Sequence, residues 1–241
     1  EDLARRVASR QPARVLEIAA GTGVVTRQLA SALPEEVSII ATDLNQTMLD
    51  TATAVGTTRP VTWRQADAMT LPFEDAEFDA VVCQFGAMFF PDKAKAFSES
   101  RRVLKTGGAF IFNVWDRIEE NEFADRVTAS LESLFPDDPP RFLARTPHGY
   151  YDLAIIEREL AGGGFTSPPR VHTLAARSKA GSPRIPAHAY CFGTPLRNEI
   201  EERDSSRLVE AADRACEAIT RQFGAGPVDG KIQAHIVVVE R

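Results

Sequence analysis

The sequence predicts an α/β fold with a mostly parallel sheet, and three observations favour this class. Short apolar runs, typical of buried parallel strands, alternate with segments of helical periodicity. Turns rich in glycine, proline or polar residues separate these segments. The chain has 241 residues, 44% of them hydrophobic and 26% charged, which fits one α/β domain with an insertion.

Five strands and the helices between them account for the first half of the chain. A helix is predicted at residues 3–9, strands at 15–18, 37–42, 61–65, 78–83 and 109–114, and the end of a helix at 103–108. Strands that alternate with helices form parallel βαβ units. Right-handed crossovers then place a ligand at the carboxyl ends of the strands, where the strand order reverses.

Residues 15–23 form the most informative motif. The apolar run is followed by Gly21 and Gly23, which allow a tight turn and close approach by a ligand, and helical periodicity restarts at Val24. A strand, a glycine turn and a helix are half of a nucleotide-binding unit. A plain left-handed turn is the alternative for both glycines.

Two residues in this motif favour S-adenosylmethionine (SAM) over NAD. A dinucleotide fingerprint has a third glycine at the position of Thr26. Glu17 lies inside the first strand, and a carboxylate attracts the sulfonium and ammonium groups of SAM, whereas the doubly negative pyrophosphate of NAD would gain nothing from it. The alternative for Glu17 is that it only ties the loop together.

Polar side chains also follow the next three strands. Asp43, about 20 residues beyond the glycine turn, is placed to accept hydrogen bonds from both ribose hydroxyls, or else it caps the next helix. Asp67 can accept from the exocyclic amine of adenine, or else it is a turn residue. Gln84 ends the fourth strand. Because these positions share one rim of a parallel sheet, we expect a single site there.

Four motifs in this order resemble those of class I SAM-dependent methyltransferases, in the small-molecule branch typified by ubiquinone/menaquinone-biosynthesis C-methyltransferases. They are the glycine motif, the strand-end Asp43, Asp67-Ala68 with Leu71-Pro72-Phe73, and Leu104-Lys105-Thr106-Gly107-Gly108. The resemblance is close over residues 1–116 and extends to the remainder in outline. It implies methyl transfer from SAM but specifies no substrate. The first glycine of the family motif is Ala19 here, which still keeps the loop small.

The resemblance implies a Rossmann-like sheet of seven mostly parallel strands, an antiparallel last strand, helices on both faces and helical insertions near the C-terminus. We expect one domain over 1–241, with the SAM-binding core at 1–116 and substrate-side cap helices with strands six and seven at 117–241. In this second part, strands are predicted at 171–176 and 232–240, helices at 119–134, 152–161, 187–202 and 205–223, and a linker at 178–186.

The expected site residues fall into three groups. The cofactor-binding group is Glu17, Ala19, Gly21, Gly23, Asp43, Leu44, Met48, Asp67, Ala68 and Gln84. The substrate-binding group is Phe85, Met88, Phe89 and Tyr151, whose apolar character suggests a partly hydrophobic acceptor. The apolar members of both groups have core packing as their alternative. His148 and Tyr150 are weak candidates for a lid that bears a general base, because a histidine on a loop is more often a surface residue.

Composition excludes several other classes. The net charge of −6 argues against nonspecific nucleic-acid binding. The three cysteines and four histidines lack disulfide or metal-ligand spacing, so we expect no metal and a reducing cytoplasm. No apolar run approaches the ~20 residues that cross a bilayer. The expected partner is a small-molecule substrate. An NAD(P)-dependent oxidoreductase and a catalytically silent SAM-binding protein remain as alternatives.

Overall fold

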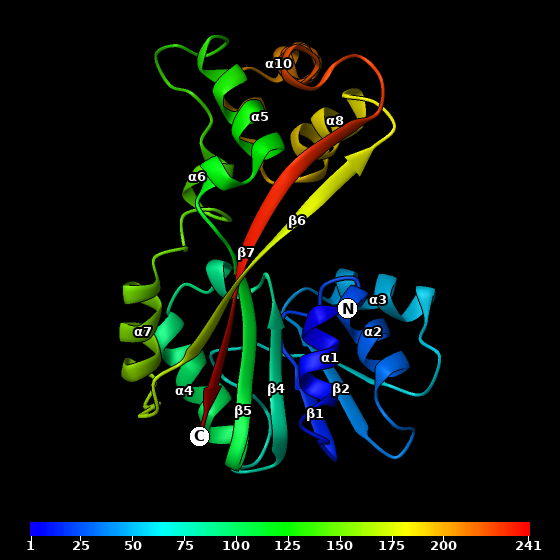
Figure 1. Ribbon diagram of the computed structural model, residues 1–241, viewed down its shortest axis with the longest axis vertical. Helices are drawn as coiled ribbons and strands as arrows, with labels where there is room; N and C mark the ends of the chain where they lie inside the picture. Colours follow the sequence, from blue (N-terminus) through cyan, green and yellow to red (C-terminus); the bar gives the residue numbers. More distant parts are fainter. The chain divides into compact units, whose positions relative to one another are not determined.

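The computed structural model describes residues 1–241, and its strands form one seven-stranded sheet in the order β3-β2-β1-β4-β5-β7-β6 (Figure 1). The strands are β1 (Arg14–Glu17), β2 (Ser38–Asp43), β3 (Thr62–Gln65), β4 (Phe78–Gln84), β5 (Leu104–Trp115), β6 (Arg170–Ala180) and β7 (Val228–Glu240). Strands β1 to β5 pair in parallel. Gly108 is hydrogen-bonded to Arg241 and Asp116 to Gln233, so β7 runs antiparallel to β5. The predicted sheet is confirmed.

Helices cover both faces of the parallel strands. The helices of the chain are α1 (Asp2–Ala8), α2 (Val24–Ala32), α3 (Gln46–Val55), α4 (Lys93–Val103), α5 (Glu122–Glu132), α6 (Phe142–Arg145), α7 (Leu153–Gly162), α8 (Arg184–Gly193), α9 (Leu196–Asp204) and α10 (Leu208–Phe223). Successive side chains of a strand point to opposite faces. In β5, Ala109 and Ile111 therefore join the apolar cluster of α1 and α2, whereas Phe110 and Phe112 pack against Phe97 of α4.

The chain divides into two compact units. The first comprises residues 1–114, 152–172 and 235–241, and the second comprises residues 115–151 and 173–234. The first unit is larger than the predicted core of 1–116 because α7 belongs to it. Ile156 and Leu160 of α7 are fully buried, and Phe165 after this helix stacks with Phe110 of β5.

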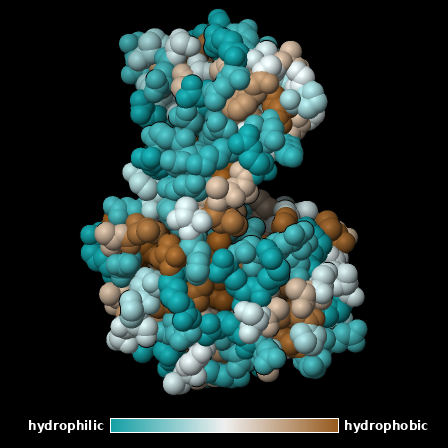
Figure 2. All heavy atoms as spheres, in the orientation of Figure 1, coloured by the Kyte–Doolittle hydropathy of each residue, from teal (hydrophilic) through white to brown (hydrophobic).

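The second unit has an apolar core of its own. It is built from one face each of α5, α8, α9 and α10, with residues such as Leu131, Ile200 and Ile219 fully or almost fully buried. The buried residues of α10 recur at helical spacing, and its remaining face is polar. Hydrophilic residues cover most of this unit on the face seen in Figure 2. No helix of the structure combines the length and the apolar character that crossing a membrane requires.

Several predicted boundaries are wrong. Strand β5 begins at Leu104 rather than at 109, because the backbone of Gly107 and Gly108, predicted at a helix end, is hydrogen-bonded to Arg241 in the sheet. Most of β6 is exposed, so apolar periodicity gave no sign that it extends to Ala180. The predicted linker 178–186 is shorter, because β6 extends to Ala180 and α8 begins at Arg184, which leaves residues 181–183 as the connection.

The predicted helix over 187–202 is two helices. Helix α8 ends at Gly193 and α9 begins at Leu196. Thr194 between them is extended, with φ −128° and ψ 166°. The following Pro195 explains the break, since the residue before a proline avoids the helical region.

Candidate functional site

A cavity of about 670 Å³ lies in the first unit, at the loops that follow β1, β2, β3 and β4. These loops are at the carboxyl ends of parallel strands, where doubly wound folds bind ligands. Eleven of the predicted site residues line this cavity: Glu17, Ala19, Gly21, Asp43, Leu44, Met48, Asp67, Ala68, Gln84, Phe85 and Phe89. The ionisable side chains among its lining residues are all acidic, namely Glu17, Asp43 and Asp67.

The loop after β1 is held open by its backbone geometry. Ala19 and Gly21 both have positive φ, 53° and 57° respectively. A Cβ atom at Gly21 would have no neighbour within 4 Å, so this glycine leaves the backbone open to a ligand. The Ala20 N–H donates to the carbonyl of Thr42 at 2.9 Å, which ties the loop to β2.

Asp43 holds this loop and the start of α3 together. Its Oδ2 accepts from the Gly21 N–H at 2.8 Å, and its Oδ1 accepts from the Asn45 N–H at 2.8 Å. Asn45, rather than Asp43, is the N-cap of α3, because its side chain accepts from Thr47. A carboxylate oxygen has two lone pairs, so Asp43 retains capacity to accept from a ligand's hydroxyl groups.

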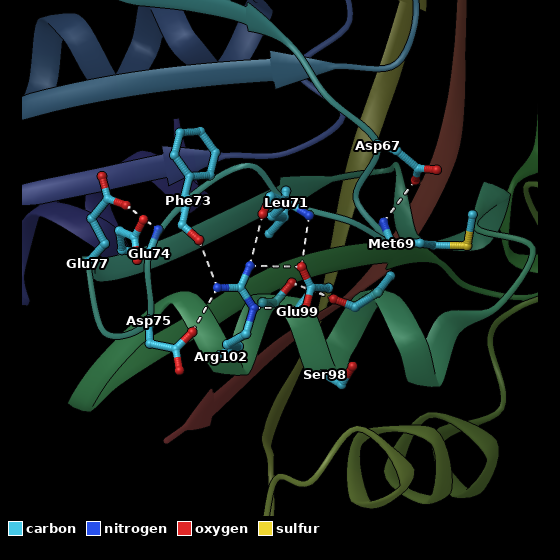
Figure 3. A network of polar contacts seen from close by, with 12 residues as sticks. Asp67, Met69, Leu71, Phe73, Glu74, Asp75, Glu77, Ser98, Glu99 and Arg102 are labelled. Atoms are coloured by element: carbon cyan, nitrogen blue, oxygen red, sulfur yellow. Dashed lines mark hydrogen bonds and ion pairs between the residues drawn. The ribbon is translucent and has the colours of Figure 1, made fainter.

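Asp67 begins the loop that follows β3. Its Oδ1 accepts from the Met69 N–H at 2.8 Å, which forms a local turn (Figure 3). This bond occupies one carboxylate oxygen and leaves the other oxygen for a donor such as an adenine amine. Asp67 and Asp43 line the same cavity, as one ligand site requires.

Arg102 of α4 clamps the continuation of this loop (Figure 3). Its guanidinium donates to the carbonyl oxygens of Leu71 and Phe73 at 2.9 and 2.7 Å, and it pairs with Glu99 at 2.9 Å. Glu99 in turn accepts from the Leu71 N–H at 2.8 Å. The hydrogen bond from Arg102 is the main reason why the pKa of Glu99 lies below its ordinary value. The clamp fixes the loop that carries Asp67.

Glu17 is almost completely buried at the end of β1, with 1% of its surface exposed. The Thr26 hydroxyl donates to its Oε2 at 2.6 Å. Burial raises the pKa of Glu17 to about 8, although the Thr26 hydrogen bond and the charge of Arg27 act in the opposite direction. The charge of Asp43 adds to the rise. The site therefore contains a carboxyl group that holds its proton at neutral pH.

Apolar side chains at the cavity are unusually exposed. Leu44, Met48 and Phe89 are 66%, 42% and 52% exposed, and each lines the cavity. Burying such surfaces against a ligand is favourable by about 25 cal/mol per Å². Phe85 also lines the cavity and has a positive φ of 52°, which is strained for a side chain of its size.

Five predicted residues are absent from the cavity lining, and two of them, Gly23 and Met88, belong to the first unit. A Cβ atom at Gly23 would stand 2.7 Å from the ring of Trp63 and 3.1 Å from Ala52. Glycine is therefore needed here to leave room for Trp63. It also has a left-handed backbone, with φ 78° at the N-terminus of α2. Met88 is buried and is absent from the lining residues. It packs in the interior, which is the alternative stated above for the apolar residues.

His148, Tyr150 and Tyr151 belong to the second unit. His148 is 5% exposed, and its Nδ1 lies 2.9 Å from the carbonyl oxygen of Asp116. A carbonyl only accepts, so Nδ1 carries a proton and a neutral ring has its lone pair on Nε2. Burial lowers the pKa of His148 and favours this neutral form. Tyr150 is buried, whereas Tyr151 is 41% exposed.

Sequence reasoning missed several lining residues: Ala20, Thr22, Val24, Val25, Asn45, Ala66, Met69, Gly86, Phe90 and Pro91. Each lies within eight positions of the end of a predicted strand, so membership of the loops that follow those strands was the available signal. Side-chain type carried little information, because the set mixes small, apolar and polar residues. No group of three or more His, Cys, Asp or Glu residues is arranged to hold a metal ion.

The fold and this site define a class of protein, and a comparison with known families agrees. Residues 16–112 match the family model described as a methyltransferase domain. This range contains the glycine loop, Asp43, Asp67 and the loop after β4. These residues therefore form a domain of the class I SAM-dependent methyltransferases. The cofactor of this class is SAM.

Within this class, the chain resembles enzymes of quinone biosynthesis. It is 30% identical over 165 residues to the ubiquinone/menaquinone biosynthesis C-methyltransferase UbiE of Pseudomonas aeruginosa (strain LESB58), covering 63% of this chain and 64% of that protein. Identity to UbiE of Teredinibacter turnerae is 38% over 165 residues, covering 63% and 66%. The matched part thus spans slightly less than two thirds of these curated relatives.

Solved structures extend the likeness in fold to the whole chain. The YcgJ protein of Bacillus subtilis has a TM-score of 0.60 at 19% identity, covering 100% of this chain and 97% of that one. The [4+2]-cyclase SpnF has a TM-score of 0.58 at 18% identity, covering 99% and 80%. Because this fold occurs in a cyclase as well, the activity has to be argued from the site.

Proposed function

We propose that this protein transfers the methyl group of SAM to a small organic or lipid-like acceptor. The observation that carries the proposal is the convergence of Glu17, Asp43 and Asp67 with the Gly21 loop on one cavity. A cavity with acidic lining suits a ligand that bears a sulfonium and an ammonium group. It disfavours NAD(P), whose pyrophosphate would face Asp43 and Asp67 and no cationic side chain of the lining.

In this proposal, each strand end binds one part of the cofactor. Asp43 accepts hydrogen bonds from the ribose hydroxyls. Asp67 and the backbone of Ala68 bind the adenine edge, while Leu44 and Met48 cover its faces. The N-terminus of α2 supplies N–H donors and a favourable dipole for the carboxylate of the methionine part.

Methyl transfer from a sulfonium is an in-line displacement with a neutral leaving group. SAM supplies the activated methyl group, so the protein has to align the acceptor, exclude water and orient the cofactor. Gln84 at the end of β4 is proposed to orient the reacting groups, and Phe85 and Phe89 to form an apolar wall for the acceptor. Alignment alone can contribute about 7–11 kcal/mol.

We also propose that the protein works in the cytoplasm on a small-molecule acceptor. All three cysteines are free thiols in the structure, which supports a reducing compartment. His148 and Tyr150 stay the candidates for a general base, supported for His148 by its lone pair on Nε2 in the neutral form, and Tyr151 stays a proposed contact of the acceptor.

The test is direct ligand binding followed by turnover. Calorimetry is expected to detect S-adenosylhomocysteine (SAH) binding and no comparable heat with NADPH. A panel of phenolic, quinol and amine acceptors is then incubated with SAM labelled at the methyl group. Preference for NADPH would overturn the assignment in favour of an oxidoreductase. SAH binding without turnover of any acceptor would favour a silent SAM-binding protein.

A further inference from the structure

Phenylalanine occupies a backbone position that favours glycine in the loop after β4. Phe85 has φ 52°, in the left-handed region where bulky side chains are strained. The next residue, Gly86, has φ −101°, which any residue can adopt. Glycine is needed at 86 for space alone, since a Cβ atom there would stand 2.5 Å from the Ala19 Cβ. The chain therefore retains an aromatic residue at 85, although glycine would adopt this backbone with less strain.

Asn113 of β5 holds Phe85 in this conformation. It lies opposite Gln84 in the register of β4 and β5, and 8% of its surface is exposed. The Phe85 N–H donates to two oxygens of Asn113, the main-chain carbonyl at 3.1 Å and Oδ1 at 3.2 Å. Within residues 109–114 of β5, Asn113 is the only polar residue. Its side chain thus adds a hydrogen bond to Phe85 that the pairing of the two strands does not require.

The conformation of Phe85 also determines where Phe89 lies. Phe85, Gly86 and Phe89 all line the cavity of the first unit. The Phe89 N–H donates to the Gly86 carbonyl at 2.9 Å, which closes a short turn directly after Phe85. Phe89 is 52% exposed at the cavity. A displacement of Phe85 would therefore move both residues that we propose as the apolar wall for the acceptor.

We propose that Asn113 is a positioning residue for methyl transfer, which acts by holding Phe85 in the strained conformation that forms this wall. The inference rests on the proposed function, because it concerns the acceptor side of the same cavity. Backbone strain persists where the surrounding structure fixes it, and it is concentrated at functional sites. Asn113 is absent from the cavity lining, so it acts through Phe85 rather than on a ligand.

The experiment measures how an apolar probe binds beside the bound cofactor product. The probe is 1-naphthol, a fluorescent phenol, titrated with protein that is saturated with SAH. Calorimetry measures the SAH affinity, and urea unfolding measures stability. Phe85→Gly is expected to weaken naphthol binding about three- to tenfold, because one aromatic contact is lost. The SAH affinity of this variant is expected to stay nearly unchanged.

Variants of Asn113 test the positioning role. Asn113→Leu keeps the size of the side chain and removes its acceptor. It is expected to weaken naphthol binding as much as Phe85→Gly does, with SAH affinity nearly unchanged. Asn113→Asp keeps an acceptor oxygen and is expected to restore most of the naphthol affinity.

A double variant tests whether Asn113 acts through Phe85. Asn113→Leu combined with Phe85→Gly is expected to bind naphthol no more weakly than Phe85→Gly alone, because the two residues act through one contact. Asn113→Leu is also expected to lower the urea midpoint less in the Phe85→Gly protein than in the wild type. The reason is that glycine keeps a positive φ without the hydrogen bond.

Asp79→Ala is the matched control at the opposite end of β4. Asp79 Oδ2 accepts from the main-chain N–H groups of Ala13 and Arg14 at 3.0 and 2.8 Å. This variant likewise removes a side-chain acceptor of main-chain donors, so it is expected to lower stability and to leave naphthol binding unchanged. If Asn113→Leu does not fold, Asn113→Ser replaces it, because its shorter side chain does not reach the Phe85 N–H.

The outcomes separate this inference from the proposed function. Equal naphthol binding by Asn113→Leu and wild type would overturn the positioning role, and so would an equal loss in Asp79→Ala. If naphthol does not bind the SAH complex of the wild-type protein, or binds Phe85→Gly equally well, the wall is overturned and the SAM site stands. Failure of SAH itself to bind the wild-type protein would overturn the proposed function as well.

Discussion

The methyl group of Ala19 lies against Gly86, so that a Cβ atom at position 86 would stand 2.5 Å from the Ala19 Cβ. Gly86 has an ordinary φ of −101°, so space rather than backbone conformation calls for glycine there. Ala19 replaces the first glycine of the family motif, and the missing side chain at 86 accommodates it. The departure in the motif is therefore balanced by a residue on the neighbouring loop.

This relationship predicts coupling between positions 19 and 86. Gly86→Ala is expected to lower the free energy of unfolding by about 1–3 kcal/mol through overpacking against Ala19 and Cys83. Adding Ala19→Gly removes one of the clashing groups and the strain of a positive φ, so the double variant is expected to recover about 1 kcal/mol. Denaturant unfolding of the four proteins measures the coupling, and strictly additive effects would contradict it.

Asp43 is expected to contribute strongly to cofactor affinity. Asp43→Ala should weaken SAH binding by roughly 2–3 kcal/mol, about 30- to 150-fold, because hydrogen bonds to a charged acceptor are lost. Asp43→Asn keeps one acceptor oxygen and should lose less. Calorimetry provides the affinities, and unfolding curves correct for the loosened contacts to Gly21 and Asn45. Unchanged SAH affinity in folded Asp43→Ala would remove this residue from the site.

The buried proton on Glu17 predicts stability that falls as pH rises. The folded pKa of about 8 exceeds the ordinary value of 4.5, so only the folded chain holds this proton between these values. The contribution is complete below pH 4.5 and declines by up to about 1.4 kcal/mol per pH unit until pH 8. Glu17→Gln keeps an acceptor for Thr26 and should lack this slope. If the free energy of unfolding depends on pH in the same way in wild type and Glu17→Gln, the raised pKa of Glu17 is disproved.

His148 is expected to give the opposite pH dependence, with stability that falls as the pH drops below neutral. Burial lowers its folded pKa below the ordinary value of 6.5, so the unfolded chain takes up a proton first as the pH falls. Its contribution to stability is complete above pH 6.5 and declines as the pH drops from there towards the folded pKa. His148→Asn keeps a donor for the Asp116 carbonyl and should lose less stability between pH 7 and 5. Urea titrations across this range measure the difference.

Arg102 is expected to matter for stability more than for cofactor contact. Arg102→Ala removes the guanidinium that donates to the carbonyls of Leu71 and Phe73, and it leaves Glu99 with the more distant Lys95, at 3.9 Å, as its cation. The loss is expected to be about 2–3 kcal/mol, since its side chain is 31% exposed. Lys95→Ala, also beside Glu99 on α4, should cost less than about 0.5 kcal/mol. In Arg102→Ala, the SAH affinity is expected to fall only several-fold, because Arg102 acts on the cofactor site through the loop that carries Asp67.

The sequence by itself determined the class of fold and the approximate location of the site. Apolar runs located all seven strands, and the rule that parallel strands end on one rim brought Glu17, Asp43 and Asp67 to one cavity. The strands are encoded by neighbouring residues in the chain, and the shared rim follows from the parallel order of the strands, so both could be predicted. Strand β6 was shorter in the prediction because an exposed edge strand carries little apolar signal.

Only the tertiary structure decided which residues meet. Gly23 turned out to make room for Trp63, forty residues away in the chain, and Gly86 to make room for Ala19. The raised pKa of Glu17 arises mainly from burial in the folded chain, which no local pattern encodes. Packing and desolvation depend on neighbours that are distant in sequence, and for that reason the chemistry of this carboxyl group became visible only in the folded chain.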